Sequence, residues 1–378
     1  MPFFSVDTEF IDEGEGMSQY ILILIWILAM FAVKMLINVG YEPVNILGRK
    51  EYRVSKNFAV LAFAPVILMA TFRRWVGDTE AYRRAFNDLP DTIAGLINYL
   101  PDVKKDSGFT VLGTLIKIMT SNDIVYFFII AAFQGLVLVY IYRKYSADYL
   151  FSVFLFIAST DIYSWMFNGM RQFTAVTIMF AATTMMLEKK WIPTLLVILL
   201  ASTMHQSALL MILLVLVSQG EAWNRKSLLF IAGTLVAVAY VDQFTDILDA
   251  MMQETQYSNM VSDWTSWGDD GTNIIRVAVY AVPTILSVIG YKQIKQANDP
   301  VINFCTNMSI VSTGLYILSV ATSGIFIGRL PIYASLYNYI LLPWQIKNIF
   351  TKQSARLVYI LATAAYLGFY LYQMFIAW

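Results

Sequence analysis

The segment NDIVYFFIIAAFQGLVLVYIY, residues 122–142, carries a single charged side chain, Asp123. About 20 apolar residues in a helix cross the hydrocarbon core of a bilayer, so this segment alone has the length of a membrane-spanning helix. Arg143 and Lys144 follow it directly. Because basic residues collect in the cytoplasmic loops of membrane proteins, the segment predicts a helix that ends at the cytoplasmic surface.

The whole chain has the same character. Its 378 residues are 58% hydrophobic and 14% charged, and the mean hydropathy is +0.61, which indicates an integral membrane protein. The formal net charge is zero, which argues against a general nucleic-acid binder. A single cysteine, Cys305, excludes an intrachain disulfide and any cysteine-based metal cluster.

Twelve apolar runs have spanning or near-spanning length. They cover residues 18–38, 56–72, 122–142, 149–167, 170–188, 191–203, 205–219, 227–241, 272–290, 301–322, 325–344 and 355–376. The short runs 191–203 and 205–219 could form one tilted helix. We prefer two helices joined by a turn at Met204-His205, because fusing them would place the basic loops that follow on the wrong side. The expected fold is all-α, a single membrane domain over 1–378 with about 12 transmembrane helices.

The charges along the chain set the expected topology. With both termini outside, every inner loop is basic, and residues 1–17 form an acidic outer tail. Residues 73–121 form an outer loop with short amphipathic helices at 79–89 and 109–119, which we expect at the outer interface. Residues 242–271 form an acidic, tryptophan-rich outer loop that could pack over this face as a lid.

Arginine and lysine divide unequally between the two sides. The outer loops contain seven arginines and three lysines, whereas the inner loops contain five arginines and ten lysines. The outer arginines are Arg73, Arg74, Arg83, Arg84, Arg171, Arg276 and Arg329. Topology has no reason to separate Arg from Lys, but recognition of phosphate or carboxylate by a planar fork of donors does.

Three of these arginines open an expected span. Arg171, Arg276 and Arg329 each begin a helix that runs from outside to inside, where the helix dipole disfavours a cation by about 0.3–1 kcal/mol and favours an anion. His205 opens a fourth such helix. Several helix N-termini and guanidinium groups at one depth would make a site for a diphosphate.

Each charged residue also has a local explanation. Asp78 could be the N-cap of the 79–89 helix. Arg83 and Arg84 could be solvated on one face of the same helix, and Arg73 and Arg74 could snorkel to the interface at the end of the second span. Arg171 could neutralise Asp161, and Arg276 could pair with Asp269 or Asp270. His205 could be a hydrogen-bonded turn residue. No HExxH, GxSxG or glycine-rich nucleotide loop occurs, so we expect no metal and no bound nucleotide.

Four segments resemble the EpsG family of bacterial exopolysaccharide polymerases, which are Wzy-like proteins. They are RRWVGDTEAY at 73–82, YSWMFNGMRQ at 163–172, MHQSAL at 204–209 and GRLPIY at 328–333. A fifth, DSGFTVLGTL at 106–115, has Asp106-Ser107 where the family has Glu-Pro, and we assign it no role. The four motifs are short, but they occur in order over about 260 residues.

The resemblance implies a multi-pass glycosyltransferase of the bacterial cytoplasmic membrane, similar to C-type glycosyltransferases, that polymerises exopolysaccharide or capsule. It would transfer the growing chain from undecaprenyl diphosphate to a new lipid-linked oligosaccharide at the outer face, without a metal or other cofactor. Its implied partners are the undecaprenyl-diphosphate-linked oligosaccharide, membrane lipid, a chain-length regulator and a flippase of the same pathway, with no nucleic acid.

From the residues and the resemblance together we assign roles. The diphosphate would be bound by Arg73, Arg74, Arg171 and Arg329. Asp78 or His205 would be the catalytic base, and we favour Asp78 because a histidine surrounded by arginines should stay neutral. The sugar subsites would be lined by Tyr82, Tyr163, Asn168, Gln172 and Tyr333.

Two other functions remain. A glycan ligase would use the same lipid-linked donor, and only its acceptor would distinguish it from a polymerase. A transporter of lipid-linked oligosaccharide would be expected to place charges or broken helices near the bilayer midplane. The concentration of unusual residues at the outer rim argues against transport.

Overall fold

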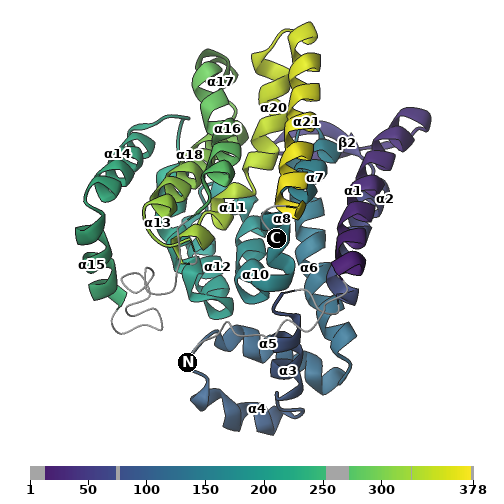
Figure 1. Cartoon of the computed structure of the whole chain (residues 1–378), viewed down its shortest axis with the longest axis vertical. Coiled ribbons are helices and arrows are strands. Elements are labelled where there is room, and N and C mark those ends of the chain that lie inside the picture. The colour runs from purple at the N-terminus through teal and green to yellow at the C-terminus, as the bar shows by residue number, and fades with distance from the viewer. Residues whose placement is uncertain (1–12, 74–76, 253–271, 325, 376–378) are drawn as a thin grey trace.

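The computed structural model describes residues 13–73, 77–252, 272–324 and 326–375 as a bundle of helices (Figure 1). A hairpin of two antiparallel strands lies at one end, which we call the hairpin end. Three short helices lie at the other, the α3–α5 end. These elements are β1 (Tyr41–Ile46), β2 (Arg49–Val54), α3 (Thr79–Asn87), α4 (Ile93–Tyr99) and α5 (Ser107–Met119).

The helical, membrane-like fold class is confirmed. Four helices are long and apolar enough to cross a membrane: α1 (Glu13–Leu36), α6 (Asp123–Tyr145), α18 (Pro300–Val320) and α21 (Lys352–Phe375). Three further spans could each be a bent pair: α7 (Tyr149–Ala158) with α8 (Thr160–Tyr163) and α9 (Trp165–Asn168), α14 (Arg225–Ala239) with α15 (Val241–Met252), and α16 (Ile274–Ile289) with α17 (Tyr291–Ala297). The described residues thus contain four spans, or up to seven if each bent pair is one span. The expected total of about 12 transmembrane helices remains a prediction.

The other elements are shorter. The short apolar helices, besides α5, are α2 (Lys56–Phe72), α12 (Trp191–Met204) and η2 (Gln206–Leu210) with α13 (Met211–Ser218). The connecting elements are η1 (Leu100–Asp102), α10 (Met170–Ala181), α11 (Thr183–Leu187), η4 (Ile327–Arg329), α19 (Ile332–Ser335) and α20 (Asn338–Ile349). The predicted turn at Met204-His205 is confirmed, because α12 ends at Met204 and His205 is its C-cap.

The two predicted outer loops are only partly described. Helices α3 and α5 confirm the two short helices expected in 73–121, and the sequence missed α4 between them. Arg84 is exposed, but Arg83 binds Asp123 at the start of α6 at 2.5 Å, so it ties α3 to the bundle. The acidic loop begins with α15, and its remainder, residues 253–271, lies outside the described residues, as do residues 1–12 of the acidic tail.

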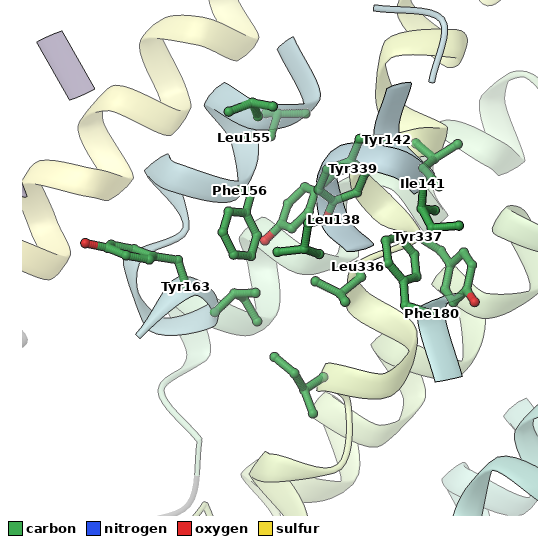
Figure 2. Close-up of a cluster of buried hydrophobic side chains, with 14 of the residues drawn as sticks. Leu138, Ile141, Tyr142, Leu155, Phe156, Tyr163, Phe180, Leu336, Tyr337 and Tyr339 are labelled. Atoms are coloured by element: carbon green, nitrogen blue, oxygen red, sulfur yellow. The ribbon is translucent and has the colours of Figure 1, made fainter. Parts of the chain in front are cut away.

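A cluster of buried aromatic rings joins the helices that position the site (Figure 2). Tyr142 of α6 and Phe180 of α10 meet edge to face with ring centroids 5.5 Å apart, and Phe180 meets Tyr337 at 5.1 Å. Phe156 of α7 and Tyr339 of α20 complete the cluster. Such pairs add about 0.5–1.5 kcal/mol each beyond the area they bury. The cluster therefore holds α10 firmly between α6 and α20.

The hairpin was not predicted from the sequence. Leu47 and Gly48 connect its strands with φ of 50° and 86°, so both lie in the left-handed region that two-residue hairpin turns of type I′ require. The hairpin is fixed to α6 by Arg143, whose Nε donates to the Val54 carbonyl at 2.6 Å and whose Nη2 lies 2.7 Å from Glu42. The segment expected as a basic loop is thus folded structure.

A polar network joins α8, α16 and α21. Arg276 Nε binds Asp161 at 2.8 Å, and the same carboxylate accepts hydrogen bonds from Tyr280 and Gln373. The explanation that Arg171 neutralises Asp161 is therefore wrong. Arg276 binds Asp161, and the partners predicted for it, Asp269 and Asp270, lie outside the described residues. Because a lone carboxylate between helices is costly, several helices share the task of satisfying it.

Replacing Arg276 by Met should destabilise the protein by about 3 kcal/mol, because it leaves Asp161 without a counter-charge. Thermal unfolding in detergent measures the effect, and Arg84→Met, which removes an exposed ion pair, is the control. The double variant Asp161→Asn with Arg276→Met should recover much of the loss. An Arg276→Met protein as stable as the control would show that the ion pair contributes little.

Candidate functional site

Four distant segments meet at the α3–α5 end, and they are the four that carry the sequence motifs. Asn168, at the end of α9, accepts a hydrogen bond from the backbone N–H of Asp78, the residue before α3. Gln172 of α10 binds the backbone at Arg329 in η4, and Ser207 of η2 binds Tyr333 of α19. Residues 165–172 form α9 and the start of α10 and are the common partner for two of these segments, and we call them the α9–α10 corner.

Gly77 is required where the first segment meets this corner. Its φ is +53°, and a Cβ there would lie 1.3 Å from the side-chain oxygen of Asn168. The same oxygen accepts a hydrogen bond from the backbone N–H of Asp78 at 3.3 Å. Because only glycine combines this backbone conformation with so close an approach, Gly77 lets Asp78 sit beside the corner.

Arg329 is held against the corner by its backbone and by its side chain. The amide of Gln172, itself buried, donates to the Arg329 carbonyl at 3.2 Å. The guanidinium lies over the Trp165 ring, 5.6 Å from its centroid, and its side chain is exposed. A cation on an aromatic face keeps its charge and its donors available to another anion. Gln172 thus acts as a support for Arg329.

Arg171 stands in the first turn of α10 and joins three elements. It binds Asp106, the N-cap residue of α5, at 2.8 Å, and it hydrogen-bonds Tyr82 of α3. The Asp106 carboxylate also accepts the backbone N–H of Gln206. Although Asp106 is almost fully buried, 46% of the Arg171 side chain is exposed. Arg171 is therefore oriented from one side and accessible from the other.

His205 belongs to a chain of hydrogen-bonding groups. Its Nδ1 lies 2.7 Å from Ser207 Oγ, which lies 2.9 Å from the Tyr333 hydroxyl. Burial first, then the charges of Arg171 and Arg329, lower the pKa of His205 to about 4. His205 is thus a hydrogen-bonded turn residue, and it is neutral at physiological pH.

Asp78 faces the arginines instead of its own helix. It occupies the N-cap position of α3, but its side chain makes no capping hydrogen bond, so the capping explanation is wrong for the carboxylate. The surrounding protein raises the pKa of Asp78 by removing water, while the charges of Arg329, Arg171 and Arg73 act in the opposite direction. Both exposed arginines therefore act on Asp78 and on His205.

Arg73 lies behind this group. Only 3% of it is exposed, and its guanidinium donates to the Met166 carbonyl and to the sulfur of Met170. It also lies over the Phe127 ring, 4.3 Å from the centroid, and burial lowers the pKa of Arg73 to about 10. Arg73 therefore fixes the α9–α10 corner in this structure and does not face solvent with Arg171 and Arg329.

Two residues that the sequence predicted in the site are not among its described residues, and three residues of the site were not predicted. Arg74 is outside the described residues. Tyr163 is fully buried in the aromatic core, where its hydroxyl contacts Met69 and not the site (Figure 2). The sequence assigned no role to Asp106, Trp165 or Ser207, although each lies in one of the quoted segments. Among the described residues, no group of three His, Cys, Asp or Glu side chains could hold a metal ion.

The chain is similar to a known protein family. A family model described as the EpsG family matches residues 56–377, which is most of the chain. No curated protein and no solved structure matches. The match contains all four motif segments that meet at the site.

The convergence of Arg171 and Arg329 on His205 can be tested without any assay of function. His205 is the only histidine, so labelling histidine with ¹⁵N gives one imidazole whose titration NMR can follow. We expect a pKa of about 4 in the wild type. Arg171→Ala and Arg329→Ala should each raise it towards about 6.5, the ordinary value, and Arg84→Ala should not. No change of the His205 pKa in the two variants would show that the arginines are not close to His205.

Proposed function

The chain belongs to the EpsG family, and on that premise we propose that it is a membrane glycosyltransferase that joins exopolysaccharide repeat units carried on undecaprenyl diphosphate. The observation that supports this most is the pair of exposed arginines, Arg171 and Arg329, which come from distant helices and act on the same carboxylate and the same neutral histidine. A leaving diphosphate needs cations, and an acceptor hydroxyl needs a base. The site offers both.

In this proposal Arg171 and Arg329 bind the diphosphate of the donor. The bond between the anomeric carbon and the diphosphate oxygen breaks, and the leaving oxygen gains negative charge that two guanidinium groups stabilise. Arg171 also stands at the N-terminus of α10, where the helix dipole favours an anion. Asp106 orients Arg171 and keeps its donors directed towards the site.

Asp78 is the catalytic base. Its carboxylate would accept the proton of the acceptor hydroxyl as that oxygen forms its bond to the anomeric carbon. A carboxylate that caps a helix is occupied, whereas that of Asp78 makes no capping bond. Its raised pKa makes it a stronger base than a solvated aspartate. His205 remains neutral and, with Ser207, would orient sugar hydroxyls, while the buried Tyr333 holds Ser207 in place.

The predicted sugar-binding residues divide into two groups. Tyr82 lies beside Arg171, where a sugar could contact it, whereas Tyr333 is only 3% exposed and supports Ser207 from within the protein. Asn168 and Gln172 use their amides to hold Asp78 and Arg329 in place, so we propose that they position these residues and do not themselves select the sugar.

The α3–α5 end would face the outside of the cytoplasmic membrane. The opposite, hairpin end carries Arg49, Arg53 and Lys347 around one polar pocket, and Arg143 and Lys144 lie at the adjacent end of α6. This distribution supports a cytoplasmic hairpin end. We also propose a chain-length regulator and a flippase of the same pathway as partners, because both would follow from this function.

Arg171→Ala and Arg329→Ala should each lower polymerisation by about 10²–10³-fold, because each removes a donor to the leaving diphosphate. The assay uses the purified protein in vesicles with one lipid-linked repeat unit as donor and acceptor, and products are separated by length. Arg84→Ala, with an exposed guanidinium on α3, should retain full activity. A ladder of products supports a polymerase, and transfer only to a different acceptor supports a ligase. Wild-type activity in both variants would exclude the assignment.

Asp78→Asn should lower the rate by about 10²–10⁴-fold, because the amide cannot accept the acceptor proton. Asp88→Asn, at the exposed C-terminus of the same helix, is the matched control. In the wild type the rate should fall with decreasing pH as Asp78 becomes protonated, above the ordinary pKa of 3.8. His205→Gln should keep this pH profile. If His205→Gln removes the acid limb while Asp78→Asn stays active, the base is His205.

A further inference from the structure

An apolar groove lies along α10, between α6 and α12. Helix α10 packs on both neighbours, and the groove between them has a volume of about 520 Å³, within the roughly 300–1,000 Å³ of ligand-binding pockets. Its walls include Ile130 and Phe133 of α6, and Leu200 and Met204 of α12. Ile178 and Ala181 of α10 lie between them. We call this the lipid groove.

Thr174 is the lining residue with a polar side chain, and its hydroxyl is satisfied within the protein. It donates to the Met170 carbonyl at 2.7 Å and accepts from the buried amide of Gln134 at 3.0 Å. The groove therefore presents apolar surface to an occupant. Phe133 and Leu200 at its edges are 40% and 53% exposed, so the groove opens sideways between the helices.

The groove and the arginine site are built from the same elements. Helix α10 carries Arg171 in its first turn and Ala181 at its end, about 15 Å further along the axis. Met204, at one end of the groove, directly precedes His205. Leu112 of α5 lines the groove, while Asp106, the cap of the same helix, binds Arg171. A molecule bound at Arg171 and extended along α10 would enter the groove.

We propose that the lipid groove binds the isoprenoid chain of the lipid diphosphate donor, next to the arginines that bind its diphosphate; this rests on the proposed function. The ligand that fits must have a multiply charged anionic end and a long apolar chain, since the site supplies two exposed guanidinium groups and then an apolar channel. Met185 and Met204 line the groove with flexible side chains, which adapt to a chain that carries methyl branches. Groove binding would hold the donor in register with Asp78.

The test fills the groove and measures lipid binding. A polyprenyl diphosphate that carries a benzophenone on its chain is cross-linked to the full-length protein in phosphatidylglycerol vesicles, and labelled peptides are identified by mass spectrometry. Labels should fall on α6, α10 and α12. Ala181→Phe should reduce labelling by about tenfold, because its ring occupies the space of the chain. Ala232→Phe, at an exposed alanine on α14, should not change it.

Competition identifies the occupant. Unlabelled polyprenyl diphosphate should displace the probe at far lower concentration than additional phosphatidylglycerol does, and equal displacement would overturn the proposal. Inorganic diphosphate, which has no chain, should inhibit cross-linking of the probe by the same factor in the wild type and in Ala181→Phe. If Ala181→Phe does not fold, Leu200→Trp fills the groove from its exposed edge and should give the same loss. Unchanged labelling in the folded variant would also overturn the proposal.

The groove and the proposed function can fail separately. If Arg171→Ala and Arg329→Ala abolish polymer while Ala181→Phe keeps full labelling and full rate, the groove assignment is overturned and the function stands. If both arginine variants make wild-type polymer, the proposed function fails, whatever the groove binds.

Discussion

The candidate site depends on a buried cation, the guanidinium of Arg73 at the α9–α10 corner. Its two terminal nitrogens bind the Met166 carbonyl and the Met170 sulfur, and the Phe127 ring covers its face, while its Nε has no partner among the described residues. A guanidinium can be buried in this way because its charge is delocalised and its donors lie in a plane. From the corner that it fixes come Trp165, Asn168, Arg171 and Gln172, through which the other segments are attached. The site is thus assembled around a charge that does not face solvent.

The arginines predicted to lie outside look alike in the sequence but have different physical roles. Arg73 is a structural cation, Arg83 joins α3 to α6, and Arg276 neutralises a carboxylate between helices. Arg84 is mostly solvated. Among the described arginines of this predicted outer set, Arg171 and Arg329 alone combine exposure with action on both Asp78 and His205. Burial and partners separate these roles, and neither can be read from residue type or from position along the chain.

The sequence predicted those structural features that depend on the local pattern of residues. Apolar length indicated the helical membrane character, and the placement of the basic loops after residue 219 indicated the turn at Met204-His205 that ends α12. It could not predict pairings across the bundle, such as Arg171 with Asp106 and Arg276 with Asp161, because both are set by packing between distant segments. The hairpin was missed because its turn is Leu47-Gly48, without the Asn-Gly or Asp-Gly that usually marks such turns. The interruption of α7 after Ala158 was missed because no proline or glycine marks it.

Because His205 is neutral, the charge of the site does not depend on the protonation of a histidine. Histidine is the side chain that ordinarily changes charge between about pH 5 and 8, and the only one in this chain does so near pH 4. Arginine charges are constant over the same range. A site on the outside of a cell meets a medium whose acidity the cell does not buffer. With fixed cations and a histidine that stays neutral, such a site would keep the same positive charge when the surroundings turn mildly acidic.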